Sequence, residues 1–92
     1  MRKRSRLDLI LEVLEAVYEE GDSNPTRLSL RVNLSYDRLK KLLDELEKRR
    51  LIEISPSNNR KGSMRVTLTR EGEKLMLELK RLKRVVEDYG LI

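Results

Sequence analysis

The chain has 92 residues and a formal net charge of +5, with charged residues making up 40% of it and aromatic residues 3%. Phenylalanine and tryptophan are absent, so the core of one small domain has to be built from leucine, isoleucine and valine. Cysteine and histidine are also absent, which excludes disulfides, thiolate or imidazole metal sites, and Cys or His nucleophiles.

Residues 1–6 (MRKRSR) carry four positive charges and have two interpretations, a solvated terminus or a basic arm that lies along a phosphate backbone. Residues 7–20 are predicted to form the first helix, which ends at Gly21. This helix is apolar on two sides, which indicates two neighbouring elements, and its many carboxylates argue against a position facing DNA. Its main apolar face consists of Leu7, Ile10, Leu14 and Val17.

Two helices joined by a short turn follow, and together they predict a helix-turn-helix. Asn24 and Pro25 suit the start of the first helix, which runs to Val32. Ser35 suits the N-cap of the second, the predicted recognition helix, which runs to about Arg50. A plain helical hairpin with a charged outer face is the alternative. The apolar stripe of the second helix consists of Leu39, Leu42, Leu43 and Leu46.

The N-terminal residues of a recognition helix reach base edges when a helix-turn-helix docks on DNA. We therefore expect Arg38 to lie near the DNA backbone and four neighbours to carry base preference. Those four are Tyr36, Asp37, Lys40 and Lys41. Asp37 and Asp44 share the outward face and repel phosphates. Asp37 either accepts from a cytosine amino group or, with Asp44, holds the affinity down.

Residues 51–55 and 64–68 alternate apolar and polar side chains, and they are predicted to be the two strands of a hairpin. The connecting residues 56–63 are turn formers and charges, so the hairpin tip corresponds to the wing of a winged helix. Basic residues of the hairpin and of the short helix before the turn are expected to contact phosphates, which position a protein without reading sequence. These candidates are Arg27, Arg60, Lys61 and Arg65, and an ordinary exposed arginine is the alternative for Arg27.

Thr69 is the predicted cap of a long last helix that runs from Arg70 to about Gly90. Apolar residues recur in it at the 4–3 spacing of a coiled-coil seam. Beyond Leu79 the helix is longer than the preceding domain can cover, so a second copy of the same helix is expected to cover the seam in a homodimer. A helix that curls back over its own domain is the alternative. The seam consists of Leu75, Leu79, Leu82, Val86 and Tyr89.

The stretches LSYDRLKKLLDELEKRRLIE and VTLTREGEKLMLEL resemble a known group of small archaeal winged helix-turn-helix DNA-binding proteins. Members of this group, described as chromatin-type proteins or regulators, dimerise through a long C-terminal antiparallel coiled coil. The resemblance implies that the recognition helix presents Ser35, Tyr36, Lys40 and Lys41. It implies a wing at Asn58, Asn59, Arg60 and Lys61, and a dimer seam at Leu79, Leu82, Val86 and Tyr89.

The sequence therefore predicts a mainly α fold with a small β-hairpin, a winged helix-turn-helix followed by a long dimerisation helix. The expected parts are a basic arm at 1–6, the DNA-binding domain at 7–69 and the dimerisation helix at 70–92. We expect a cytoplasmic, nucleoid-associated homodimer that binds double-stranded DNA, with no enzymatic activity, cofactor, metal or membrane partner. A protein–protein interaction module acting through its coiled coil is the alternative, and three tyrosines offer little for stacking single strands.

Overall fold

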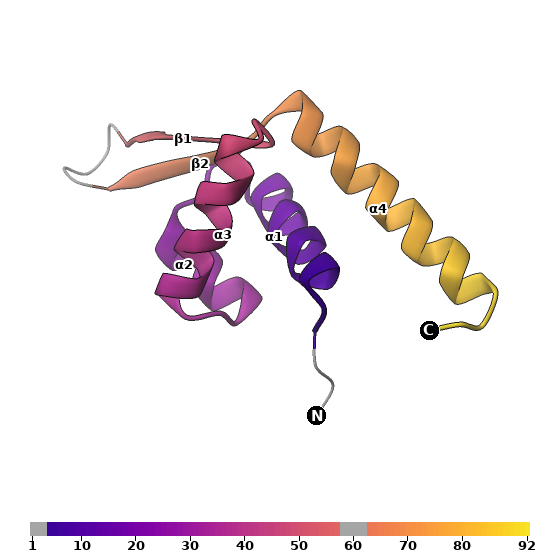
Figure 1. Cartoon of the computed structure of the whole chain (residues 1–92). Coiled ribbons are helices and arrows are strands. Elements are labelled where there is room, and N and C mark those ends of the chain that lie inside the picture. Colours follow the sequence, from indigo (N-terminus) through magenta and orange to yellow (C-terminus); the bar gives the residue numbers. More distant parts are fainter. Residues whose placement is uncertain (1–3, 58–62) are drawn as a thin grey trace.

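The computed structural model describes residues 4–57 and 63–92. A two-stranded antiparallel hairpin and four helices make up the fold, which confirms the predicted fold class (Figure 1). The elements are α1 (Arg6–Glu20), α2 (Pro25–Val32), α3 (Tyr36–Lys48), β1 (Ile52–Pro56), β2 (Met64–Leu68) and α4 (Arg70–Asp88). No helix in the described part of the chain is both long and apolar enough to cross a membrane.

The core is aliphatic, as the composition requires, and it draws a side chain from every element. α1 lies between α2 and α4 and also contacts β2, so the prediction of two neighbours for this helix is confirmed (Figure 1). Leu7 is the exception on the predicted face, because its side chain is 53% exposed. The largest fully buried side chains are Leu14, Leu28, Leu39, Leu43, Ile52, Met76, Val13, Val17 and Val66.

The turn between α2 and α3 sets the direction of the predicted recognition helix. Asn33 adopts the left-handed conformation, with φ of 56° and ψ of 52°, and Asn is among the residues that tolerate it. The backbone N–H groups of Asn33 and Leu34 both donate to the carbonyl of Ser29, which closes the end of α2. The Ser35 hydroxyl then accepts the Arg38 backbone N–H at 3.3 Å, so the predicted cap of α3 is confirmed.

The end of α3 and the start of β1 differ by a residue or two from the sequence prediction. Arg50 has a φ of 59°, and the Leu51 N–H donates to the Leu46 carbonyl at 3.0 Å. This hydrogen bond makes Leu51 part of the helix-closing turn. α3 therefore ends at Lys48, and β1 begins at Ile52 rather than at Leu51.

The hairpin is tied to the rest of the domain through the loop between α1 and α2. β1 and β2 pair with Ile54 opposite Val66. On the other edge of β2, the Val66 N–H donates to the Ser23 carbonyl at 2.7 Å and the Ser23 N–H donates to the Val66 carbonyl at 3.3 Å. β2 is thus hydrogen-bonded on both of its edges, to β1 and to the loop that precedes α2.

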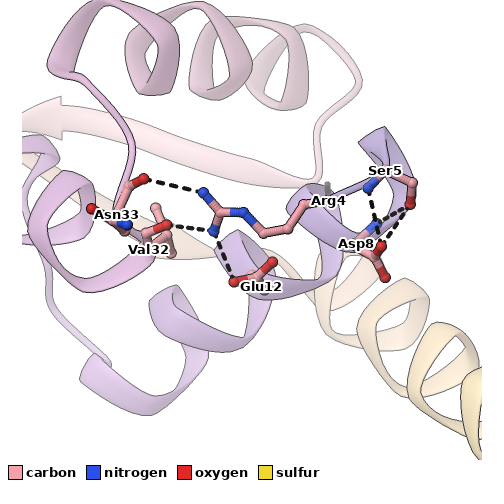
Figure 2. A network of polar contacts seen from close by, with 6 residues as sticks. All are labelled: Arg4, Ser5, Asp8, Glu12, Val32 and Asn33. Carbon is pink, nitrogen blue, oxygen red and sulfur yellow. Dashed lines mark hydrogen bonds and ion pairs between the residues drawn. The ribbon is translucent and has the colours of Figure 1, made fainter. Parts of the chain in front are cut away.

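Arg4 joins α1 to the end of α2 (Figure 2). Its guanidinium donates to the carbonyls of Val32 at 2.6 Å and Asn33 at 3.1 Å, and it forms an ion pair with Glu12 at 3.0 Å. A cation at a helix C-terminus satisfies orphan carbonyls and complements the helix dipole. Beside it, Ser5 and Asp8 form a reciprocal capping box that begins α1.

α4 contacts the domain mainly through its first three turns. Gly72 and Met76 are buried, Leu75 and Leu79 are half-buried against the core, and Lys80 forms an ion pair with Glu15 at 3.7 Å. From residue 80 onward every side chain except that of Val86 is exposed, and Figure 1 shows α4 diverging from α1 towards its C-terminal end. The second half of α4 therefore receives little cover from its own domain.

Gly72 is needed for close packing of α4 on the end of α3, and we predict that Gly72→Ala destabilises the protein. A Cβ at this position would lie 2.0 Å from the Leu51 carbonyl oxygen and 2.8 Å from the Leu68 Cδ1. The overpacking should cost about 1 to 3 kcal/mol even though alanine is the better helix former. Urea denaturation measures this, with Glu73→Ala as a control in the same turn. Equal or higher stability of Gly72→Ala would contradict the close approach.

We predict that Arg4→Ala lowers the free energy of unfolding by about 1 to 2 kcal/mol, because two backbone carbonyls and one carboxylate lose a charged donor. Arg81→Ala is the matched control, since Arg81 is exposed and forms no ion pair or side-chain hydrogen bond within residues 4–57 and 63–92. Thermal and urea denaturation of both variants test this. Identical losses in the two variants would show that Arg4 is an ordinary surface residue.

Candidate nucleic-acid interface

Four buried leucines fix which side of α3 faces outward. Leu39, Leu42, Leu43 and Leu46 all lie in the core, which confirms the predicted stripe. Successive residues of a helix are rotated by about 100° around its axis, so the sequence tells which residues lie on the side opposite the leucines. That outward face consists of Asp37, Lys41, Asp44 and Lys48, all of which are exposed.

The charge along α3 is uneven. Residues 36–41 contain three basic residues and one acidic residue, a net charge of +2, while residues 42–48 contain one basic and three acidic residues, a net charge of −2. The basic half is the N-terminal half, which in helix-turn-helix docking points at base edges. The acidic half repels phosphate. α3 is therefore suited to an anionic partner only at its N-terminal end.

The predicted base-contacting residues lie together at that end. Tyr36, Asp37, Arg38 and Lys41 are exposed, and no ion pair is recorded for any of these four side chains within the described residues. Lys40 differs, because it is half-buried and its ammonium lies 3.5 Å from the Asp44 carboxylate one turn later. Asp44 therefore neutralises one of the three basic residues, and Arg38 and Lys41 remain as the cations free to bind.

The predicted phosphate contacts that the structure describes are both engaged within the protein. Arg27 of α2 lies 3.3 Å from the Glu20 carboxylate, and Arg65 of β2 lies 2.9 Å from the Asp22 carboxylate. Both arginines are at the surface, so their guanidinium groups are accessible to a partner from outside. The expected wing contacts Asn58, Asn59, Arg60 and Lys61 lie outside the described residues.

A cluster that sequence reasoning missed lies at the end of α1. Glu20 accepts hydrogen bonds from Arg31 and from the Ser23 hydroxyl and forms an ion pair with Arg27. Glu19 forms a further ion pair with Arg31. The spacing of Arg27 and Arg31 was visible in the sequence. Their carboxylate partners depend on how the loop folds α2 back on α1, which no local pattern reveals.

For residues 1–6 the sequence allows a solvated terminus or a basic arm along a phosphate backbone. In the structure, Arg4 and Arg6 of this segment instead have partners within the protein. Arg4 binds Glu12 and the end of α2, and Arg6 forms an ion pair with Glu45 of α3.

No group of three or more carboxylates suited to a metal ion occurs in residues 4–57 and 63–92.

Comparison with solved structures gives the same arrangement in several proteins. The YusO protein from Bacillus subtilis matches with a TM-score of 0.83 at 19% sequence identity, over 90% of this chain and 59% of that chain. The transcriptional regulator BldR from Sulfolobus solfataricus matches with a TM-score of 0.82 at 22% identity, over 90% of this chain and 59% of that chain. A mutant of MarR from E. coli, solved in complex with operator DNA, matches with a TM-score of 0.75 at 23% identity, over 79% of this chain and 52% of that chain.

These TM-scores establish a shared fold, and at identities below 25% they establish the fold alone. The chain covers less than two thirds of the length of each of these three proteins. A search of the curated proteins by sequence gave no match. A family model described as winged helix-turn-helix matches residues 3–87, which includes every helix and strand except the last residue of α4. The chain therefore belongs to the winged helix-turn-helix family.

Proposed function

We propose that this protein is a non-enzymatic, double-stranded DNA-binding regulator or chromatin-associated protein of the cytoplasm that acts as a homodimer. The observation that carries the proposal is the N-terminal half of α3, residues 36–41, which has a net charge of +2. The buried leucine stripe of the helix turns Tyr36, Asp37, Arg38 and Lys41 outward to solvent. The fold supports it, since the E. coli MarR mutant that shares it was solved in complex with operator DNA.

Within this proposal, the roles of the residues follow from their positions. Lys41, Tyr36 and Asp37 contact base edges, and Arg38 contacts the backbone beside them. Arg27 and Arg65, together with Arg60 and Lys61 of the wing, contribute affinity by neutralising phosphates and releasing counterions. Lys40 contributes once it leaves Asp44. The acidic second half of α3 keeps the contact limited to the first two turns of the helix.

The homodimer part of the proposal is supported by the uncovered half of α4. Leu82 and Tyr89 of the predicted seam, and Val85 beside them, are exposed on the second half of α4, which its own domain leaves largely uncovered. An isolated apolar seam of this length is costly in water, and pairing with the same helix of a second copy would cover it. The dimer then carries two recognition helices at a separation set by α4.

A protein–protein interaction module is the second candidate. It is favoured by the charge balance of α3, which carries four basic and four acidic residues in all. In this case the partner docks on α4, and the outward face of α3 stays in solvent. The absence of duplex binding at low salt would favour this candidate over the first.

Lys41→Ala should weaken binding to a mixed-sequence duplex of about 30 base pairs by about 1 kcal/mol or more, roughly fivefold in Kd, because one free cation at the groove-facing end is lost. Fluorescence anisotropy at three salt concentrations measures the affinity, and log Kd should change linearly with log salt for a DNA binder. Lys83→Ala on α4 removes the same charge away from the interface and is the control. Equal loss in both variants would mean that α3 does not face DNA.

Leu82→Glu should convert the protein to monomers, since it places a charge in the centre of the seam. Leu77→Glu is a closely matched control, because both leucines are 55% exposed in the single chain. The two side chains point about 140° apart around the helix. Analytical ultracentrifugation distinguishes the species. A wild-type protein that sediments as a monomer at high concentration, or a dimer that survives Leu82→Glu, would remove the seam from the proposal.

A further inference from the structure

The end of α1 and the loop after it place three carboxylates against three arginines. Glu20 lies 3.3 Å from Arg27 and 3.4 Å from Arg31, and Glu19 pairs with Arg31 as well. On the hairpin side, the Asp22 carboxylate lies 2.9 Å from Arg65. Arg27 and Arg31 belong to α2 and Arg65 to β2, and the proposed function assigns phosphate contacts to both elements.

Glu20 is held more firmly than an ordinary surface carboxylate. Its side chain is 14% exposed, and it accepts hydrogen bonds from the Ser23 hydroxyl and from Arg31. A carboxylate with little access to water is costly in free energy when it has no partner. Glu20 therefore retains its arginine partners more strongly than an exposed carboxylate would. The Arg27 side chain is nevertheless 64% exposed, so its outer N–H groups can be reached from solvent.

A carboxylate and a phosphate are competing acceptors for the same guanidinium, since each offers two oxygens in the geometry that arginine binds. We propose that Glu19, Glu20 and Asp22 form an internal phosphate mimic that positions these arginines in the free protein and must be displaced, at least in part, when DNA binds. The mimic lowers the affinity for DNA below the affinity that the same arginines would give if they were unpaired. This inference rests on the proposed DNA-binding function.

Glu20→Gln removes one competing charge while keeping the shape of the side chain. If the mimic competes with phosphate, this variant should bind the 30-base-pair duplex about two- to fivefold more tightly at low salt, the range expected for releasing partly exposed ion pairs. A residue with a purely structural role would give the opposite sign, because its loss would loosen α2 and weaken binding. Glu73→Gln on α4 is the control for net charge, since Glu73 is exposed and no ion pair is recorded for it in the described part of the chain.

The gain should depend on the arginines themselves. In an Arg27→Ala, Arg31→Ala background, Glu20→Gln should leave the Kd within about 1.5-fold of its parent, because no guanidinium remains to be released. Asp22→Asn tests the hairpin side in the same way, with Arg65→Ala as its background. The Asp22 side chain is 59% exposed, so this variant folds even if Glu20→Gln does not.

A gain in Glu20→Gln or Asp22→Asn that exceeds the gain in Glu73→Gln and vanishes in the arginine-free backgrounds would support the mimic. Equal gains in Glu73→Gln, or weaker binding by folded Glu20→Gln and Asp22→Asn, would overturn it while leaving DNA binding intact. Failure of the wild-type protein to bind any duplex at low salt would overturn the proposed function and this inference together. The wild-type titration therefore separates the two failures.

Discussion

The packing of α1 between its neighbours is the constraint on which the rest of the structure depends. Val13 and Leu14 are fully buried in its centre, and α2, β2 and α4 all contact it. Around that apolar centre runs a rim of carboxylates, each paired with a cation from another segment. The rim consists of Glu12 with Arg4, Glu15 with Lys80, Glu19 with Arg31, and Glu20 with Arg27 and Arg31. Apolar burial supplies most of the stabilisation, while these partly exposed pairs mainly fix orientation.

α3 packs on the domain through one side only, which leaves its opposite side in solvent. α3 contacts α2 and β1 through its leucine stripe, and Arg6 ties Glu45 to the start of α1. The four glutamates of α1 are each paired with a cation of the protein itself. A basic N-terminal half of α3 remains at the surface with Arg38 and Lys41 unpaired among the described residues. A protein with nearly as many acids as bases can in this way present a locally basic surface.

The same ion pairs occupy several of the arginines that contribute to the positive charge of the chain. Arg4 stabilises the end of α2, and Arg27 and Arg65 are held by carboxylates in the free protein. Ion pairing leaves the net charge at +5, but these three arginines can contact another anion only by giving up a partner within the protein. Under the proposed function, DNA binding exchanges these internal ion pairs for phosphate contacts, which favours moderate affinity and a strong response to salt over tight non-specific association.

Local chemistry determined most of the elements from the sequence alone. The caps at Asn24, Ser35 and Thr69 and the leucine stripe of α3 each depend on residues within one or two turns, so the pattern alone predicts them. Only the tertiary structure decided which basic residues are free, because the partners of Arg4 and Arg65 come from segments 8 to 43 residues away. The tertiary structure also explains the glycine at position 72. The closing turn of α3 brings the Leu51 carbonyl to the place that a Cβ of residue 72 would occupy. Long-range approach of this kind leaves no periodic signal in the chain, and the candidate site depends on it more than the fold does.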